Sequence, residues 1–416
     1  MLGPRGRPGR KGRPPRALSS AVANDRVPPG SQTGLREANR ARIITVVQQR
    51  GSITQVELAA LTGLSAATIS NIVKELTGAG VLSTAPTSRS GRRAQLVTLA
   101  RNLGLVAGVH FAERSMRVAL GDVTQKVIAE QRLPLPPEHR ADSGLDRAAL
   151  LIEEMVDSRG AAPGEVLALG VGVPAPVDVR TGTVSAAGLL RGWDGVVVPV
   201  VLGRRLGVPV RVDNDANLGA LAEVRLGAAR GFADVAYLRT SHGIGMGLVL
   251  GGEVYRGRVG AAGEIGHMIV QDDGPPCRCG SRGCLETFVG SSAVVVRLDG
   301  RYRHLTLRDL VQHAREGDEA CARVVADIGE RLGAALATVC AVLDPEMIVV
   351  GGELAHAGEL LLGSVRESLE DRALVTAAGP VQVVESALGD QAEVRGALAL
   401  ALDAARVTAP VAMVQR

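Results

Sequence analysis

The chain has 416 residues, and its 47 basic and 43 acidic side chains leave a formal net charge of only +4. This length allows two or three domains, whose cores must be aliphatic, because aromatic residues make up only 2% of a chain that is 46% hydrophobic. No unbroken apolar run is long enough to span a bilayer, and no apolar segment follows the basic N-terminus, so we expect a cytoplasmic protein that does not contact a membrane.

The first 34 residues are rich in Gly, Pro, Arg and Ser, which predicts a disordered basic tail. Residues 1–16 hold six Lys or Arg and no acid. Residues 5–8 (RGRP) and 11–14 (KGRP) resemble the core of an AT-hook, whose arginines enter a narrow A·T minor groove. A nonspecific basic tail, or sequence upstream of the true translation start, is the favoured alternative, because such short patterns arise readily in Arg-rich stretches.

After residue 34 the sequence changes to short amphipathic segments. A first helix is predicted over residues 36–49, where apolar side chains gather near one face. A second helix follows Thr54, which forms a capping-box pattern with Glu57, and it ends near residue 61. Ser65 caps a third helix that extends to residue 79 and stops at Gly80. Two strands are predicted at 81–83 and 96–99, with a Ser-, Gly- and Arg-rich loop over 86–93 between them.

Two helices around a glycine-containing turn, followed by two strands, predict a winged helix-turn-helix over residues 35–100. Its second helix would enter a major groove, and the arginines of the wing would contact phosphates or the minor groove. The candidate DNA-binding residues are Ser65, Thr68, Ser70, Asn71, Lys74, Arg89, Arg92 and Arg93. The alternative is a helical hairpin with a solvated polar face. The ordered set of capping box, turn, strand pair and basic wing favours double-stranded DNA as a partner.

Residues 101–416 alternate Val-, Leu-, Ala- and Gly-rich strands with helices, which predicts an α/β domain. The predicted strands cover residues 106–109, 116–121, 166–173, 208–212, 235–238, 247–250 and 347–350. The predicted helices cover residues 146–158, 218–226, 320–343 and 393–405.

A cluster of cysteines indicates a metal site. His267, Cys277, Cys279 and Cys284 have the spacing H-x9-C-x-C-x4-C, and three thiolates with one imidazole suit a closed tetrahedral Zn²⁺ site. The alternative, three inert thiols, is weak because buried structural cysteines rarely cluster in a polar Gly- and Pro-rich segment. The other two cysteines lie in apolar helical surroundings and are expected in the core.

Several stretches of the α/β region match known motifs. Residues 263–267 are GEIGH, residues 277–286 are CRCGSRGCLE, and three further stretches are 170–178 (GVGVPAPVD), 213–217 (DNDAN) and 344–352 (DPEMIVVGG). Together they resemble the ROK family (repressors, open reading frames and sugar kinases). The first two resemble its zinc signature, and the others its sugar-proximal, catalytic-base and adenosine-side loops. The similarity runs from about residue 35 to residue 405.

The resemblance implies a two-lobed actin/hexokinase-like ATPase fold for residues 101–416, with the C-terminal helix returning to the first lobe and a sugar in the cleft. By position, the sugar-binding residues would be Asn214, Asp215, Glu264, His267 and Glu286, and their amide, carboxylates and imidazole suit sugar hydroxyls. In the kinases of the family, the residue at the position of Asp215 is the base that takes the proton of the attacking hydroxyl.

The chain departs from those kinases where ATP would bind. The kinases place a motif of the type Asp-x-Gly-Gly-Thr after the first strand, whereas residues 110–114 here are HFAER. His110 thus replaces the acid, and Ala112 and Glu113 replace glycines that would admit phosphate. The second loop, Gly-Thr-Gly-Ile-Gly in the kinases, is half retained as SHGIG over 241–245. We therefore expect a sugar pocket without ATP binding or catalysis. Residues 189–192 (LLRG) also differ from the usual turn, so the ligand is unusual or absent.

Three hypotheses remain: a sugar-responsive DNA-binding regulator, most simply a repressor of carbohydrate uptake or catabolic genes; an ATP-dependent sugar kinase with an accessory DNA-binding domain; and a DNA-binding scaffold with a vestigial pocket. The altered first phosphate loop disfavours the kinase, and the intact sugar-site set disfavours the scaffold. The expected partners are an operator and a sugar or sugar phosphate, and the expected assembly is a homodimer or homotetramer. The sugar, the operator and the sign of the response stay open.

Overall fold

The structure is a computed structural model that describes residues 32–89, 92–136, 139–185, 190, 192–298, 302, 305–372 and 381–405. The AT-hook-like stretches at 5–8 and 11–14 therefore lie outside the described residues. Contacts divide the chain into two units between Ala41 and Arg42, inside the first helix. That helix already begins at Gln32, so the last residues of the predicted tail are helical.

The predicted winged helix-turn-helix forms from short capped helices and a three-stranded sheet of order β1-β3-β2. The elements are α1 (Gln32–Arg50), β1 (Ser52–Thr54), α2 (Gln55–Thr62), α3 (Ala66–Gly78), β2 (Leu82–Arg89) and β3 (Arg92–Leu99). The capping box is present, since Thr54 Oγ1 accepts from the backbone N–H of Glu57 while Glu57 Oε2 accepts from that of Thr54. Ser65 Oγ likewise caps α3 by accepting from the N–H of Thr68.

The predicted loop over residues 86–93 was wrong. Strands β2 and β3 pair continuously from Leu82↔Leu99 to Arg89↔Arg92, and β1 joins the sheet through Ile53↔Val97. Pro is depleted in strands, and Ser and Arg are not among the residues that favour them, but cross-strand pairing and burial of residues such as Val97 outweigh that weak local preference.

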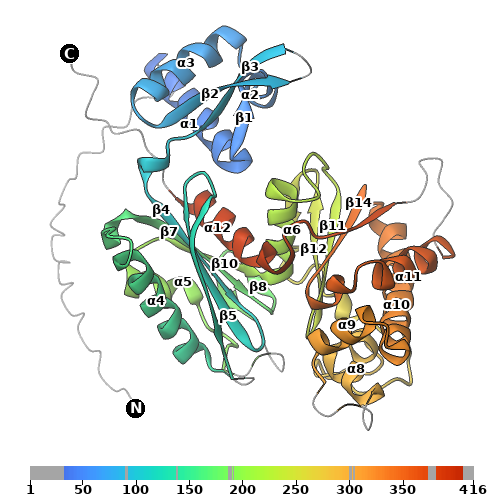
Figure 1. Ribbon diagram of the computed structural model, residues 1–416. Coiled ribbons are helices and arrows are strands. Elements are labelled where there is room, and N and C mark those ends of the chain that lie inside the picture. The colour runs from blue at the N-terminus through green and yellow to red at the C-terminus, as the bar shows by residue number, and fades with distance from the viewer. Residues whose placement is uncertain are drawn as a thin grey trace, which may run out of the picture. The chain divides into compact units, whose positions relative to one another are not determined.

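The first lobe is built on a five-stranded sheet of order β10-β7-β4-β5-β6 (Figure 1). Its strands are β4 (Leu105–Phe111), β5 (Ser115–Asp122), β6 (Val127–Pro134), β7 (Val166–Val173) and β10 (Val210–Asn214). Helices α4 (Ala141–Asp157) and α5 (Val198–Leu206) pack on one face, and β8 (Val177–Asp178) pairs with β9 (Thr183–Val184) beside it. Within this core, Trp193 is fully buried edge-on against Phe111, and its Nε1 donates to the carbonyl of His139.

The second lobe repeats this topology. Its sheet has the order β13-β12-β11-β14-β15, so that in both lobes the strands, numbered along the chain, lie in the order 3-2-1-4-5. The strands are β11 (Val235–Thr240), β12 (Ile244–Leu250), β13 (Glu253–Tyr255), β14 (Met347–Gly351) and β15 (Gln382–Glu385). The helices are α7 (Glu286–Val289), α8 (Ser291–Arg297), α9 (Leu307–Arg315), α10 (Glu319–Leu343) and α11 (Glu359–Glu370).

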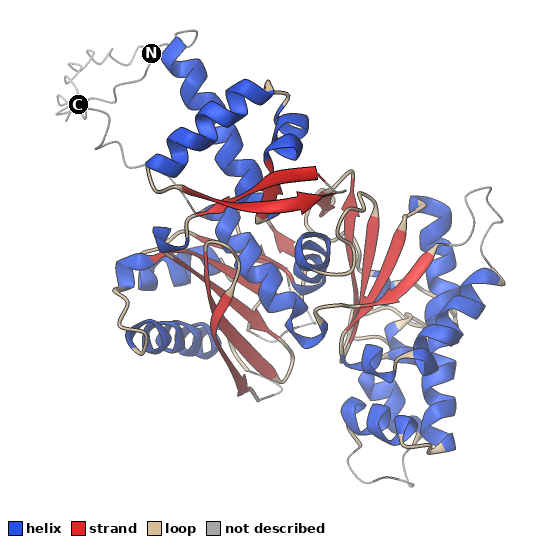
Figure 2. Ribbon diagram, turned by 45° about the horizontal axis from the view of Figure 1, so that its top comes forward, coloured by secondary structure: helices blue, strands red, loops and turns tan. Residues whose placement is uncertain are grey.

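Two helices lie between the sheets and join the lobes (Figure 2). Helix α6 (Asp215–Leu226) leaves the first sheet and packs on β11 and β12, and α12 (Ala392–Ala404) leaves the second sheet and packs on β4 and β7. Glycines permit this approach. A Cβ on Gly170 of β7 would lie 1.9 Å from the Ala397 carbonyl oxygen, and one on Gly396 would lie 2.0 Å from that of Leu218. Helix α6 begins three residues before the predicted 218, so that Asp215 stands in its first turn.

The predicted elements of the α/β region are present, but ten further ones were missed: β6, β8, β9, β13, β15, α5, α7, α8, α9 and α11. The missed strands are mostly short and lie at sheet edges, where little periodicity can be read. Helices α5, α9 and α11 do carry apolar side chains at helical spacing, so the sequence held a signal for them that was overlooked. Among the described residues, no single helix has the length and apolarity to cross a membrane; α2 and α3 meet that test only as a pair, bent by 116° at their turn.

The close packing of α12 on the first sheet is testable. Gly170→Ala should lower the unfolding free energy by about 1–3 kcal/mol or more, because the backbone of α12 has no room to yield to a methyl group. The matched control is Gly164→Ala, whose Cβ would meet no atom within 4 Å. Thermal unfolding of the two variants measures the difference, and equal melting temperatures would contradict this account of the helix–sheet contact.

Candidate functional site

The five predicted sugar-site residues line one small cavity of about 60 Å³ in the cleft between the lobes. They are Asn214, Asp215, Glu264, His267 and Glu286. Asn214 ends β10 and Asp215 begins α6, while Glu264 immediately precedes the 3-10 turn Ile265–His267. The residue pattern identified the members of this set, and the fold brings together segments more than 70 positions apart in the chain.

Asn214 mainly organises the backbone of the cavity. Its Oδ1 accepts from the N–H groups of Ala216 and Asn217 and caps α6, while its Nδ2 donates to the carbonyl of Ala175 at 3.3 Å. One Nδ2 hydrogen remains for a ligand. Asn214 therefore positions Asp215 at the start of the helix as well as facing the cavity.

Asp215 is not a free carboxylate. Arg239 of β11 places Nη1 3.3 Å from Asp215 Oδ2, and His110 of β4 places Nε2 3.5 Å from the same oxygen. All three side chains are nearly buried. Burial alone would raise the pKa of Asp215, but Arg239 and then His110 outweigh it and hold the pKa below its ordinary value. A carboxylate with a lowered pKa is a weaker base.

The charge network continues into α12. Arg239 Nε donates to Glu393 Oε1 at 3.1 Å, and the buried Tyr237 hydroxyl donates to the same oxygen at 3.1 Å. One arginine thus links the first residue of α6 to the second residue of α12. Because α6 and α12 join the lobes, a movement of one lobe relative to the other would disturb this network.

Glu286 is also paired. Arg278 Nε lies 2.8 Å from Glu286 Oε1, and Arg278 Nη2 and the backbone N–H of Ile244 donate to Oε2. This bidentate pair places a second arginine at the cavity wall. Glu264 has no such partner among the residues that the structure describes. Burial, and then the charges of Asp215 and Glu286, raise its pKa to about 7.

The predicted metal ligands converge. One ligand atom from each of His267, Cys277, Cys279 and Cys284 lies within 4.8 Å of all the others, which forms a cluster able to hold a metal ion. Cys279 Sγ and Cys284 Sγ are 3.7 Å apart, and two thiolates about 2.3 Å from a tetrahedral zinc would be separated by about 3.8 Å. His267 turns Nδ1 toward Cys277 Sγ, 3.5 Å away, while the residue also lines the small cavity.

The altered phosphate loops face the same cleft. Glu113 and His242 line both the small cavity and a larger neighbouring one. The retained Gly352 has φ +89°, and a Cβ there would lie 2.4 Å from the Thr240 carbonyl oxygen. The fold alone therefore requires this glycine, whatever binds in the cleft.

The DNA-binding candidates are mostly exposed. Ser70, Asn71 and Lys74 point to solvent from α3, opposite the buried Ile69 and Val73. The hydroxyls of Ser65 and Thr68 hydrogen-bond each other at 2.8 Å, so each has less hydrogen-bonding capacity left for DNA. Arg93 is exposed on β3, whereas the side chains of Arg89 and Arg92, like residues 189 and 191 before Trp193, lie outside the described part.

Sequence reasoning missed Arg239 and the ion pairs of Arg278 and His110. Arg278 lies inside the quoted cysteine motif and His110 was noted only as a lost acid, so neither had an assigned partner. Arg239 lies within an apolar strand, where a single charged residue in an otherwise buried segment was the available signal.

The fold defines a two-lobed, actin/hexokinase-like domain that follows a winged helix-turn-helix. Residues 106–404 match the model of the ROK family, and residues 36–83 match a winged helix-turn-helix DNA-binding model. The chain belongs to the ROK family.

Known relatives include both regulators and kinases. The xylose repressor of Caldicellulosiruptor bescii is 28% identical over 389 residues, covering 90% of this chain and 97% of that protein. A solved ROK family transcriptional regulator, a homologue of the E. coli MLC protein, superimposes with TM-score 0.73 at 25% identity and covers 89% and 97% of the two chains. The ROK family glucokinase of Streptomyces griseus, solved with glucose and AMPPNP, gives TM-score 0.63 at 29% identity but covers only 72% of this chain and 99% of its own.

The raised pKa of Glu264 predicts a pH-dependent stability. The folded protein holds its proton to about pH 7, whereas the unfolded chain releases it near 4.5, so this stabilisation is complete below 4.5 and is lost as the pH rises through 7. Glu264→Gln should therefore melt clearly higher than wild type near pH 8.5, with a much smaller difference near pH 5.5. Glu153→Gln, on the exposed face of α4, is the control. A Glu264→Gln melting curve that parallels wild type at both pH values would contradict the assignment.

Proposed function

We propose that the chain is a sugar-responsive, DNA-binding transcription regulator, most simply a repressor of carbohydrate uptake or catabolic genes. The observation that carries the proposal is the share of this chain that each known structure covers. The regulator structure covers 89% of this chain, more than the two-lobed part alone contains, whereas the glucokinase covers 72%, about the share that residues 106–404 make up. The xylose repressor, matched over 90% of this chain, points the same way.

In this proposal Asn214, Asp215, Glu264, His267 and Glu286 bind the sugar. Their cavity of about 60 Å³ is far smaller than the roughly 300–1,000 Å³ of typical ligand pockets. A monosaccharide must therefore widen the cleft to enter, and its hydroxyls must compete with Arg239 and His110 for the Asp215 carboxylate. Sugar binding is thereby linked to the charge network between the lobes.

The same network argues against phosphoryl transfer. A base paired with Arg239 has a lowered pKa and holds a proton weakly, and Ala112 and Glu113 stand where glycines would bring backbone N–H groups to phosphate. ATP binding and catalysis are therefore absent in the proposed function, and Asp215 acts as a sugar contact rather than a catalytic base.

Helix α12 is the proposed path from sugar to DNA. It starts beside Glu393 in the charge network, and near its other end the carbonyls of Leu402 and Ala405 accept from Gln48 Nε2 of α1 at 3.5 and 3.3 Å. Leu398 and Leu402 belong to the same apolar cluster as Ile43 of α1. Rearrangement at Asp215 would thus be transmitted along one rigid helix, and a ligand shifts this equilibrium only by its differential affinity for the two states.

The remaining roles are proposed from the same basis. Ser65, Thr68, Ser70, Asn71 and Lys74 would read or hold the operator, with Arg89, Arg92 and Arg93 as the wing. Two such heads in a homodimer or homotetramer would bind half-sites about one helical turn apart. The domains would extend over 35–100 and 101–416, in a cytoplasmic protein.

Structural Zn²⁺ would bind His267, Cys277, Cys279 and Cys284, and it would cross-link the loop between Glu264 and Glu286.

The regulator hypothesis is tested with an operator selected from random duplexes and a panel of monosaccharides and their phosphates. An effective sugar should change operator affinity by roughly tenfold or more, and Asp215→Asn should bind the operator normally but lose this response. Asp157→Asn, exposed at the end of α4, should retain it. Formation of sugar phosphate with ATP and magnesium, abolished by Asp215→Asn, would instead make the protein a kinase that also binds DNA.

The metal prediction concerns zinc content. The purified protein should contain about one zinc per chain, and Cys279→Ser should lose it, because three ligands no longer close the tetrahedral site. Since the cysteine loop carries Glu286 to the cavity, the variant should also lose its sugar response. Cys340→Ala, on α10 away from the cluster, should keep both. A metal-free wild type with a normal sugar response would contradict the structural role.

A further inference from the structure

A separate cavity of about 750 Å³, here called the α6 groove, lies away from the cleft between the lobes. One wall comes from the winged helix-turn-helix, through the end of α1, β1, α2 and strands β2 and β3. The other wall comes from α6, the loop after it, β12 and β13. None of its described lining residues lines the cavities of the cleft, so whatever occupies this groove is distinct from a ligand held between the lobes.

Both walls of the α6 groove carry apolar side chains. The main ones are Ile53, Leu61, Leu96, Leu221, Val224 and Val254. Leu61 of α2 is 52% exposed, although it lies over this apolar surface. Exposed apolar side chains that gather on one surface indicate a place where a partner binds.

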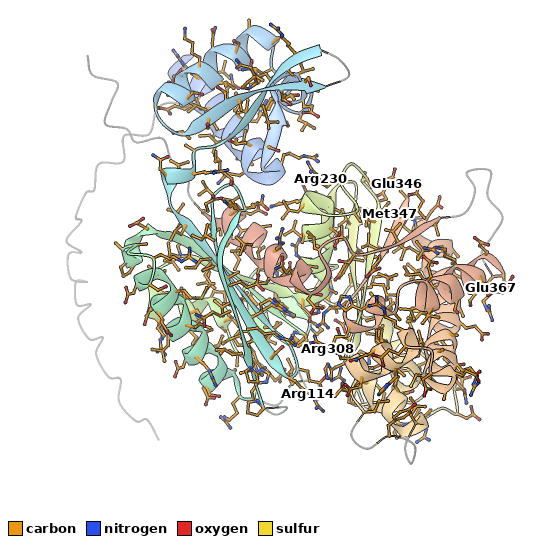
Figure 3. The ribbon with its side chains drawn as sticks, in the orientation of Figure 1. Arg114, Arg230, Arg308, Glu346, Met347 and Glu367 are labelled. Carbon is orange, nitrogen blue, oxygen red and sulfur yellow. The ribbon has the colours of Figure 1, made fainter. Side chains whose placement is uncertain are left out.

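The charged side chains of the groove favour neither sign. Arg50 and Arg230 are matched in number by Glu57 and Glu253. Figure 3 shows Arg230 on the loop that follows α6, at the edge of the second-lobe wall. A further arginine of the groove, Arg225, is already neutralised by an acid of α12. The groove therefore selects an occupant by its apolar surface and not by its charge.

The C-terminal end of the described chain lies directly beside this groove. The last described residue is Ala405, whose carbonyl accepts from Gln48 Nε2 at 3.3 Å, and the next residue of α1, Gln49, lines the groove. On the other wall, Arg225 donates to both carboxylate oxygens of Asp403. The last turn of α12 is thus fastened to both walls, and residue 406 begins within easy reach of the groove.

The composition of residues 406–416 (RVTAPVAMVQR) suits an apolar groove. Six of these eleven residues are Val, Ala or Met, and the two charged ones are the first and the last. Segments that stay solvated have low hydrophobicity and high charge, which this segment lacks. In an extended conformation every second side chain lies on one face, and the face that starts at residue 407 consists of Val407, Ala409, Val411 and Met413. Eleven extended residues reach about 35 Å, which is ample to line the groove.

The groove also offers backbone partners to such a segment. Strand β1 is an outer strand of the three-stranded sheet and β13 is an outer strand of the second-lobe sheet, and both line the groove. An outer strand leaves backbone N–H and C=O groups on one side without a sheet partner, and an extended segment can pair with them. Pro410 is compatible with this pairing, because proline is tolerated in a strand at a sheet edge.

We propose that residues 407–414 dock in the α6 groove of their own chain, with the face of Val407, Ala409, Val411 and Met413 on the apolar walls. The docked segment fastens the winged helix-turn-helix to the second lobe through contacts on both walls. It thereby adds a second connection to the one that Gln48 makes with the end of α12. The proposal depends on neither the sugar response nor DNA binding.

The first test is amide hydrogen exchange of the full-length protein. Residues 407–414 should exchange at least about tenfold more slowly in wild type than in Val411→Glu/Met413→Glu, because two charges on the docking face expel it from an apolar groove. The matched control is Thr408→Glu/Gln415→Glu, which adds the same charge at polar positions and should keep the protection. Neither variant changes a described side chain, so the packing of the lobes is not at issue.

The second test locates the segment by photo-cross-linking from Leu61→p-benzoylphenylalanine. Trypsin cleaves after Arg406, so residues 407–416 form one peptide, and this peptide should be attached to the probe. A probe at Leu150, which is 56% exposed on α4 of the first lobe, should not capture it. Mixing unlabelled with isotopically labelled protein shows whether the peptide belongs to the same chain.

Four results would overturn the proposal. The first is a wild-type segment that exchanges as fast as Val411→Glu/Met413→Glu, which means that it does not dock. The second is an equal loss of protection in the control variant, which excludes docking through the apolar face. The third is a protected segment that cross-links to the Leu150 probe and not to the Leu61 probe, which places it elsewhere. The fourth is capture only of the labelled partner's peptide, which makes the occupant a second copy.

Discussion

The buried ion pair between Asp215 and Arg239 is the interaction on which the rest of the site depends. Removing a charge from water is costly, and the loss of one partner of a buried pair typically destabilises a protein by about 3–5 kcal/mol because the other charge remains uncompensated. Here the arginine serves two carboxylates, one at the start of each helix that joins the lobes. The position that supplies a base in a kinase is therefore part of the framework that holds the two lobes together.

The two helices are fastened at both ends. Beyond the charge network, Arg225 near the end of α6 donates to both carboxylate oxygens of Asp403 near the end of α12, at 2.9 and 2.8 Å. Between these ends the helices contact each other and the sheets through glycines. A helix held in this way moves as one body, because a densely packed interior shifts between discrete arrangements and does not deform gradually. Such a body can connect a pocket to a distant segment without a chain of flexible contacts.

Much of this architecture could be predicted from the sequence. The capping box at Thr54 and the cap at Ser65 predicted helix starts to the residue, because capping is local chemistry. The cysteine spacing predicted the metal cluster, since ligand identity and loop length nearly determine it. The duplicated strand order could not be foreseen, because no repeated sequence accompanies it. The partners of Arg239 could not be predicted either. Arg239 lies 24 positions from Asp215 and 154 positions from Glu393 in the chain, and only the assembled sheets bring these residues together.

The scarcity of aromatic residues has a spectroscopic consequence. The chain has one tryptophan, and Trp193 lies fully buried against Phe111, the residue that directly follows His110. Its indole N–H is hydrogen-bonded to the His139 carbonyl, so the ring is held both by its aromatic contact and by its polar atom. Tryptophan emission from this protein therefore has a single origin, a ring that packs on the strand neighbour of the histidine that contacts Asp215. Natural fluorescence reports the state of the first lobe beside the charge network, with no introduced label.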